Sequence, residues 1–343
     1  MKAVRFVGAG RPPEIVDVPR PTPGPGQVVI KIAGAGVCHS DLHLFDEDFG
    51  LRTPFTLGHE NAGWIDAVGA GVEGWKPGDA VAVCGPWGCG RCHACQSSAE
   101  NYCEQHAFLD TMGGGLGADG GMAEYMLVPS ARLLVPLGTL DPRLAAPLSD
   151  AGLTPYHAIK AALPLLHPGT TAVVVGIGGL GHLGVQILRA LSAVRIIACD
   201  VDEQKLAHAR ALGVEHAINT SDTDAAAKAI RRLCGPRGAV LALDFVGAQA
   251  TINLCTRVVG RNSRLTIVGL GGGTLHYSAN QPPYGCAVSI PYWGSRIELM
   301  EVIALAADGR IRPEVEQFPL ERAVEVYQKL RDGQITGRAV LVP

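Results

Sequence analysis

The stretch from Thr171 to Asp200 constrains the fold of this chain more than any other. Ala172–Val175 is a short apolar run rich in valine, which is typical of a strand covered on both faces. A glycine cluster follows, and a helical pattern comes after it. A second apolar run then ends at Asp200. The cluster has the spacing G-x-G-x-x-G, with its glycines at Gly176, Gly178 and Gly181.

The context of this glycine cluster predicts a dinucleotide site. It follows a strand, opens a helix and is followed about 20 residues later by an acid, as the dinucleotide fingerprint requires. Gly176 would permit the tight turn, Gly178 the approach of backbone to a pyrophosphate, and Gly181 close packing of helix on strand. Gly179 and Leu180 complete the expected phosphate loop, at a helix start that favours anions. The alternative is a structural turn that binds nothing.

Length and charge restrict the classes of partner. A chain of 343 residues most often makes two domains, and a net charge of −3 gives no footprint for nucleic acid or an anionic membrane. The N-terminus lacks the apolar region of a signal peptide, and no apolar run approaches the ~18 residues of a membrane span. We therefore expect a soluble, cytoplasmic protein that binds neither nucleic acid nor membrane.

The pattern of strand and helix signals along the sequence predicts an α/β protein with two domains. Residues 1–152 read as an irregular, partly open β-barrel in which no helical period lasts more than one turn. Residues 153–290 alternate strands with helices, which predicts a doubly wound parallel sheet. Residues 291–343 are expected to rejoin the first domain. Within them, Ser295 and Glu298 have the capping-box pattern that starts a helix.

A four-cysteine lobe, residues 86–105, interrupts the barrel region. Its cysteines are Cys89, Cys92, Cys95 and Cys103, and four thiolates at this spacing suit a closed, structural zinc site. Disulfides are disfavoured by a cytosolic context and by the crowded spacing. An iron–sulfur cluster uses the same ligands and stays an alternative. His93 and His106 lie nearby and are expected in solvated loop positions.

Three separated residues offer a second metal site. Cys38, His59 and Asp150 would leave a tetrahedral zinc one open position, the arrangement of a catalytic site. Each of them could equally be an ordinary turn residue, so spacing alone leaves their convergence open.

Taken together, these motifs resemble those of the zinc-dependent medium-chain alcohol dehydrogenases over essentially the full length of the chain. The motifs that carry the resemblance are Cys38-His39-Ser40-Asp41, Gly58-His59-Glu60, the four-cysteine lobe, Gly176–Gly181 and Asp200. The segments Asp150–His157 and Pro291–Gly294 are most similar to the bacterial NAD-dependent secondary-alcohol dehydrogenases. The resemblance implies a Rossmann sheet, a GroES-like catalytic domain and a homodimer or homotetramer.

The resemblance also implies roles for residues around a catalytic zinc. Cys38, His59 and Asp150 would bind it, giving two zinc ions per chain with the lobe, although many family members have cysteine at the position of Asp150. The resemblance also assigns roles to four residues near these ligands. Glu60 would approach the metal, Asp41 would orient His59, and Ser40 and His43 would carry the alcohol proton toward solvent. A pocket wall is the alternative role for His43.

The cofactor implied is NAD. Asp200 would bind the adenosine ribose, and Val201 in place of arginine disfavours NADP. Further contacts are expected from Lys205 to the ribose and from Thr154, Val268 and Tyr292 around the nicotinamide. Apolar pocket walls are expected from Phe49, Leu116 and Trp293, together with Tyr292.

Such an apolar pocket suits small secondary alcohols and ketones. The alternatives are a primary-alcohol or polyol dehydrogenase on the same framework, a zinc-free quinone reductase, and a cofactor-binding protein without activity. Cys38, His59 and the four lobe cysteines argue against the last two classes.

Overall fold

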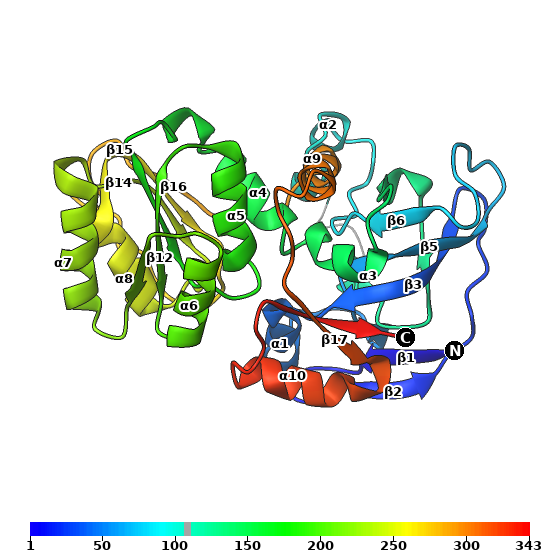
Figure 1. The fold of residues 1–343 in the computed structure, drawn as a ribbon. Helices are drawn as coiled ribbons and strands as arrows, with labels where there is room; N and C mark the ends of the chain where they lie inside the picture. The colour runs from blue at the N-terminus through cyan, green and yellow to red at the C-terminus, as the bar shows by residue number, and fades with distance from the viewer. Residues whose placement is uncertain (106–110) are drawn as a thin grey trace. The chain divides into compact units, whose positions relative to one another are not determined.

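The computed structural model describes residues 1–105 and 111–343, and the described chain divides into two compact units (Figure 1). Unit 1 contains Met1–Leu153, Trp293–Gly309 and Pro313–Pro343, and unit 2 contains Thr154–Tyr292 and Arg310–Arg312. His106 lies outside the described residues. Among the helices described, none combines the length and the apolar character needed to cross a membrane.

Unit 2 is built on a six-stranded parallel sheet with the order β13-β12-β11-β14-β15-β16. This is the doubly wound arrangement that the alternating pattern predicts. Its strands are β11 (Thr171–Val175), β12 (Arg195–Asp200), β13 (His216–Asn219), β14 (Ala239–Asp244), β15 (Val259–Ile267) and β16 (Ala287–Ser289). Its helices are α4 (Leu153–Lys160), whose first residue belongs to unit 1, α5 (Gly181–Leu191), α6 (Glu203–Ala211), α7 (Thr223–Cys234) and α8 (Gln249–Val258).

Helices cover both faces of this sheet, with α5 and α6 on one side and α7 and α8 on the other (Figure 1). Every residue of β11 and β14 is consequently buried. Alternate side chains of β11 point to opposite faces, so Val173 and Val175 pack with Ile230 of α7 and Ile252 of α8. This double coverage explains the uninterrupted apolar runs in the sequence.

Unit 1 is built on a mostly antiparallel sheet with the order β10-β6-β5-β3-β18-β17, to which β9 adds by pairing with β3. A smaller sheet has the order β2-β1-β4, and β7 pairs with β8. The strands are β1 (Lys2–Phe6), β2 (Glu14–Asp17), β3 (Val28–Gly36), β4 (Phe55–Thr56), β5 (Glu60–Val68), β6 (Ala80–Val83), β7 (Gly113–Gly114), β8 (Gly117–Ala118), β9 (Tyr125–Val128), β10 (Leu134–Pro136), β17 (Val315–Pro319) and β18 (Arg338–Val342).

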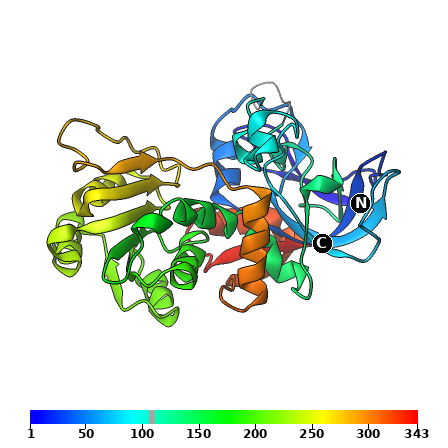
Figure 2. The same cartoon turned by 90° about the horizontal axis from the view of Figure 1, so that it is seen from above.

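The described part of unit 1 also contains five helices, and Figure 2 shows the fold from a second direction. They are α1 (His39–Asp46), α2 (His93–Gln96), α3 (Pro142–Ala145), α9 (Arg296–Ala307) and α10 (Ala323–Arg331), with short 3₁₀ turns η1 (Glu100–Tyr102) and η4 (Ala146–Ser149) among their connections. The capping box predicted at Ser295 and Glu298 is present at the start of α9. The last strand, β18, pairs with β3, so the end of the chain joins the sheet formed by its beginning.

One expectation for this region is wrong: α1 is a helix of eight residues, where no helix longer than one turn is expected. The helix begins after Cys38, whose amide donates to Oδ2 of Asp41, 3.1 Å away. That bond satisfies one amide at the helix start. Two turns are too few for an apolar period to show in sequence, and a buried aspartate on the inner face obscures it further.

Candidate metal and dinucleotide sites

Three side chains of unit 1 converge on one point. The ligand atoms of Cys38, His59 and Asp150 all lie within 4.8 Å of one another. Oδ2 of Asp150 is 3.7 Å from Sγ of Cys38 and 3.6 Å from Nε2 of His59. All three side chains are buried. A thiolate, an imidazole and a carboxylate facing one point form a donor set that fits zinc.

The pairing of β3 with β5 brings two of these residues together. Gly36 pairs with Glu60 in the antiparallel register, so Cys38 and His59 lie just beyond paired strand ends. A Cβ at Gly36 would overlap the carboxylate of Glu60, so only glycine fits there. Asp150 follows the turn η4, which contacts β3 and β5. The site is therefore a product of strand register and one turn.

Asp41 lies behind His59. Its Oδ1 is 3.2 Å from Nδ1 of the imidazole, so Nε2 is the nitrogen turned toward Cys38 and Asp150. Its Oδ2 accepts hydrogen bonds from the Cys38 amide and, at 3.0 Å, from the hydroxyl of Tyr327. Burial raises the pKa of Tyr327 well above its usual value, and the charge of Asp41 raises it further. Tyr327 is thus a neutral donor to Asp41.

Glu60 is bound to an arginine that the sequence does not single out. The guanidinium of Arg338 donates to both oxygens of Glu60, at 2.8 and 2.9 Å, and lies 3.4 Å from Oδ2 of Asp150. Oε1 of Glu60 also accepts from the amide of Ala151. Burial raises the pKa of Glu60, and the charge of Arg338 acts in the opposite direction. In this structure Glu60 pairs with Arg338, and the same guanidinium also lies beside Asp150.

Tyr327 and Arg338 are the residues of this cluster that sequence reasoning missed. Both come from the last 20 or so residues of the chain, on α10 and β18. No local motif marks them, and only the return of the C-terminal segment to unit 1 brings them beside Asp41 and Glu60.

The two expected proton-relay residues lie on α1. Oγ of Ser40 is 3.5 Å from Sγ of Cys38. His43 is half-buried and three residues further along the helix, a spacing that puts the two side chains on the same face. Their role in proton transfer stays a prediction.

The four-cysteine lobe brings its thiols to one point. The four sulfurs lie within 4.8 Å of one another, with Cys89 to Cys95 at 4.0 Å and Cys92 to Cys103 at 3.9 Å. Sulfurs held ~2.3 Å from a tetrahedral zinc would be about 3.8 Å apart. Backbone amides donate to the sulfurs, and the amide of Arg91 contributes most to lowering the pKa of Cys89 to about 6. All ten cysteines are free, so no disulfide competes with a metal here.

The three glycines of the G-x-G-x-x-G motif occupy three distinct environments. Gly176 has φ of 87°, a left-handed conformation that favours glycine. A Cβ at Gly181 would overlap the carbonyl oxygen of Gly176, so that glycine permits the turn to close on itself. A Cβ at Gly178 would meet no atom within 4 Å, so this position faces open space. The loop therefore packs tightly against itself at Gly181 and leaves free space beside Gly178.

Asp200 lies at the end of β12, beside this loop. Its Oδ2 accepts from the amide of Ile177 at 2.7 Å, and its Oδ1 accepts from the amide of Asp202. A carboxylate has about four lone-pair sites, so both oxygens can accept further bonds. Lys205 and Val268 are half-buried, Thr154 is buried, and Tyr292 is half-buried.

Two exposed valines lie near the loop: Val201, already noted as a residue that disfavours NADP, and Val246, which no sequence motif marks. Val201 follows β12 and is 65% exposed, and Val246 lies two residues after β14 and is 38% exposed. Because β12 and β14 both pair with β11, the valines flank the strand that leads into the glycine loop. An exposed apolar pair at the carboxyl edge of a doubly wound sheet suits a flat aromatic ligand.

The three residues expected to line a substrate pocket have different surroundings. Phe49 is 51% exposed in the loop after α1, whereas Leu116 and Trp293 are buried. The indole ring of Trp293 meets the ring of His59 edge-on, with the ring centres 5.6 Å apart. The structure thus brings Trp293, of the three, into contact with the three-residue metal cluster.

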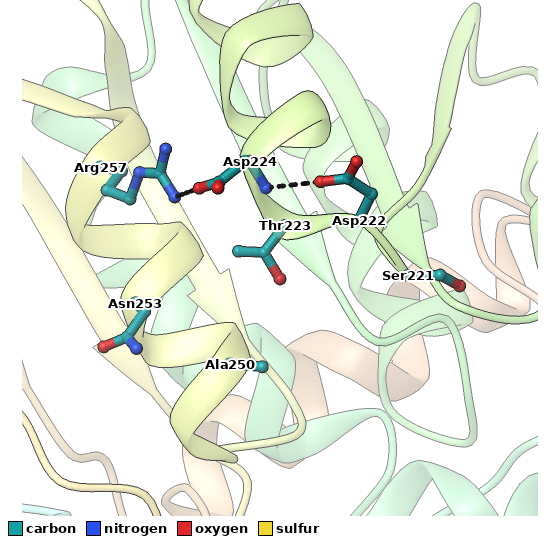
Figure 3. A pocket seen from close by; sticks show the side chains of 7 residues that line it. All are labelled: Ser221, Asp222, Thr223, Asp224, Ala250, Asn253 and Arg257. Carbon is teal, nitrogen blue, oxygen red and sulfur yellow. Dashed lines mark hydrogen bonds and ion pairs between the residues drawn. The ribbon is translucent and has the colours of Figure 1, made fainter.

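A surface hollow of about 520 Å³ lies between α7 and α8, as Figure 3 shows from close by. Its lining residues are Ser221, Asp222, Thr223, Asp224, Ala250, Asn253 and Arg257. Asp224 and Arg257 are joined by an ion pair at 2.5 Å. No predicted site residue lines this hollow, so we assign it no role in the site.

Comparison with known proteins identifies the family. The alcohol dehydrogenase GroES-like domain matches residues 24–139, and the zinc-binding dehydrogenase domain matches residues 179–306. An NAD-dependent alcohol dehydrogenase of Sulfurisphaera tokodaii is 37% identical over the whole length of both chains. This chain belongs to the zinc-dependent alcohol dehydrogenases.

Solved structures of other alcohol dehydrogenases and reductases are similar to this chain in both sequence and fold. The alcohol dehydrogenase of the hyperthermophilic archaeon Aeropyrum pernix is 38% identical and superposes with a TM-score of 0.92, with both chains fully covered. Acetophenone reductase from Geotrichum candidum, solved in complex with NAD, is 30% identical with a TM-score of 0.86 and covers 100% of this chain and 97% of its own. The predicted fold class and family are therefore confirmed.

Proposed function

We propose that this alcohol dehydrogenase interconverts small secondary alcohols and ketones with NAD, using a catalytic zinc held by Cys38, His59 and Asp150. The single observation that carries the proposal is the convergence of these three donors in unit 1. Three protein ligands leave one position of a tetrahedral zinc for substrate, which distinguishes the site from the closed lobe of Cys89, Cys92, Cys95 and Cys103. When bound, zinc polarises the alcohol or carbonyl oxygen and NAD carries the hydride.

The residues around the metal ligands prepare the site. Asp41 holds Nδ1 of His59 and so presents Nε2 to the metal. Arg338 balances the charges of Glu60 and Asp150, which would otherwise repel each other in a buried site. Ser40 accepts the alcohol proton and passes it along α1 toward His43 and solvent. The proximity of Ser40 to Cys38 supports this path.

The cofactor is assigned to unit 2, with residues 153–290 as the dinucleotide-binding domain and residues 1–152 and 291–343 as the catalytic domain. Gly176 to Gly181 would cradle the pyrophosphate, with the amides of Gly179 and Leu180 at the start of α5. Asp200 accepts from the ribose hydroxyls and repels a 2′-phosphate, with Lys205 beside it. Val201 and Val246 hold the adenine between them. Thr154, Val268 and Tyr292 complete the set near the nicotinamide.

An apolar pocket sets the substrate class. We assign its walls to Phe49, Leu116, Tyr292 and Trp293, and a pocket with one metal for orientation favours small apolar alcohols over charged acids. A relative that reduces acetophenone, a ketone, supports this preference. A primary alcohol or a polyol is the alternative substrate on the same framework.

The assembly that we propose is a homodimer or homotetramer in the cytoplasm. Strand β16 lies at the edge of the unit 2 sheet, and Tyr284 and Ile290, on either side of it in sequence, are exposed by 63% and 73%. An exposed edge with apolar neighbours suits pairing with a second copy. Ten free cysteines suit a reducing compartment.

The test is NADH formation from NAD with 2-butanol and with 1-butanol, each repeated after treatment with a zinc chelator, together with the zinc content of the untreated protein. We expect about two zinc ions per chain, faster turnover of 2-butanol, and loss of turnover on chelation. Faster turnover of 1-butanol would keep the mechanism and reject the pocket assignment. A fully zinc-loaded protein that turns over neither alcohol would reject the proposed substrate class.

A further inference from the structure

Trp293 is held in a backbone conformation that tryptophan rarely adopts. Its φ is 53°, in the left-handed region that favours glycine. Bulky residues persist there only where their surroundings hold them, and such residues gather at functional sites. The contacts around Trp293 therefore matter more than its burial alone.

The indole of Trp293 touches both sides of the metal cluster. Its N–H donates to the carbonyl oxygen of Ser149 at 3.0 Å, and Ser149 directly precedes Asp150. Its ring meets the imidazole of His59 edge-on, at an angle of 88°. A Cβ at Gly85 would overlap the indole, so this glycine leaves the space that the ring fills. One rigid side chain thus contacts His59 and the residue before Asp150.

The helix α9 starts three residues after Trp293, with Ser295 as its N-cap residue. Ser295 and Glu298 close the helix start with reciprocal hydrogen bonds of 2.9 and 3.3 Å. The amide of Arg296, the first residue of α9, donates to Oε1 of Glu100 at 2.7 Å. The side chain of Arg296 also donates to the carbonyl oxygen of Leu134.

Glu100 belongs to the four-cysteine lobe, between Cys95 and Cys103. Its side chain is buried, and its bond to Arg296 joins residues 196 positions apart in the sequence. A carboxylate at a helix start accepts from an amide that has no partner within the helix. The lobe therefore bonds to the start of α9, and Trp293 lies only three residues before that start in the chain.

We propose that Glu100 and Trp293 form a positioning link through which the four-cysteine lobe keeps His59 and Asp150 in the geometry that the three-ligand metal site requires. The inference rests on the proposed zinc ligands. Neighbours that fix the orientation of ligands control metal affinity, because a ligand that must reorganise binds less well. A displacement at the start of α9 moves the indole against both His59 and Ser149 at once. The lobe then serves the reactive site as well as its own zinc.

The competing role for Trp293 is a pocket wall that touches substrate alone. The two roles differ in what they predict without substrate. A pocket wall affects turnover and leaves metal retention unchanged. A positioning link changes metal retention in the free enzyme.

The experiment follows metal release to a chelator from the full-length, metal-loaded protein in the absence of cofactor and alcohol. Loss of metal from the three-ligand site is the phase that disappears in Cys38→Ser. The test variants are Glu100→Ala, Trp293→Phe and their combination. Glu100→Gln keeps an oxygen acceptor for the Arg296 amide. Glu104→Gln is the matched control, because Glu104 is exposed and bonds to the amide of Ala94 within the lobe.

We expect Glu100→Ala and Trp293→Phe each to speed release from the three-ligand site about tenfold. The double variant should release metal no faster than the faster single variant, since the two residues act in series. Glu100→Gln and Glu104→Gln should stay near the wild-type rate. Unchanged release in Glu100→Ala, or effects that multiply in the double variant, would overturn the link.

Failure of the proposed metal site would look different. The wild-type protein would then hold one metal ion per chain, and no release phase would depend on Cys38. Should Trp293→Phe fail to fold, Glu100→Ala compared with Glu100→Gln still decides the question, because neither change touches the cluster.

Discussion

The hydroxyl of Tyr327 donates a 3.0 Å hydrogen bond to Oδ2 of Asp41, and the other oxygen of Asp41 faces His59. The two bonded residues are 286 positions apart in the sequence. Asp41 is fully buried, and its partners are Cys38 just before α1, His59 just before β5 and Tyr327 on α10. The last helix of the chain therefore helps to set the orientation of a proposed zinc ligand.

Replacing Tyr327 with phenylalanine should weaken the fold. Removing a donor to a buried carboxylate costs about 1–3 kcal/mol, so the free energy of unfolding in urea should fall by that amount. Tyr277→Phe is the control, because Tyr277 is 68% exposed. Equal stability of Tyr327→Phe and the wild type would mean that the bond to Asp41 contributes nothing net.

Replacing Arg338 with methionine should be more damaging. The change leaves the carboxylates of Glu60 and Asp150 without their shared cation in a buried site. Breaking such an arrangement by removing one partner costs about 3–5 kcal/mol. The double variant Arg338→Met, Glu60→Gln should recover part of this loss, measured by urea unfolding. A double variant less stable than Arg338→Met would contradict the pairing of Arg338 with Glu60.

Two glycine variants separate fold from cofactor binding. Gly181→Ala places a Cβ on the carbonyl oxygen of Gly176, so we expect a lower melting temperature. Gly178→Ala places a Cβ in open space, so we expect the melting temperature of the free protein to hold while NADH affinity falls. NADH fluorescence titration and thermal unfolding measure the two effects. Wild-type NADH affinity in Gly178→Ala would place the pyrophosphate elsewhere.

Replacing Asp200 with serine should change cofactor selectivity. The loss of a charged acceptor for the ribose hydroxyls costs about 1.5–3 kcal/mol, which corresponds to a roughly 10- to 100-fold lower NAD affinity. NADP affinity should fall less, because the repulsion of its 2′-phosphate disappears as well. The ratio of kcat/KM for the two cofactors is the measurement. Asp200→Asn is the companion variant, since it keeps an oxygen for the Ile177 amide. An unchanged ratio in both variants would remove Asp200 from the cofactor site.

Local patterns determined much of this protein in advance. A buried parallel strand must be apolar throughout, and a phosphate loop needs glycine at fixed offsets, so β11 and its loop are visible in a stretch of 30 residues, Thr171 to Asp200. The same holds for the four-cysteine lobe, whose ligands lie within 15 residues, Cys89 to Cys103. The capping box of α9 is also local. Each of these features depends on neighbours in sequence, so its pattern can be read without a fold.

Tertiary structure decided the rest of the site. Cys38, His59 and Asp150 come from distant segments, and only the pairing of β3 with β5 and the turn η4 brings them to one point. Tyr327, Arg338 and Glu100 carry no motif at all, because their partners are distant in the sequence. The separation is 196 positions for Glu100, 278 for Arg338 and 286 for Tyr327. Their chemistry is that of buried charges and donors. Burial is a property of the assembled fold, and a sequence pattern shows it only where neighbouring residues share it.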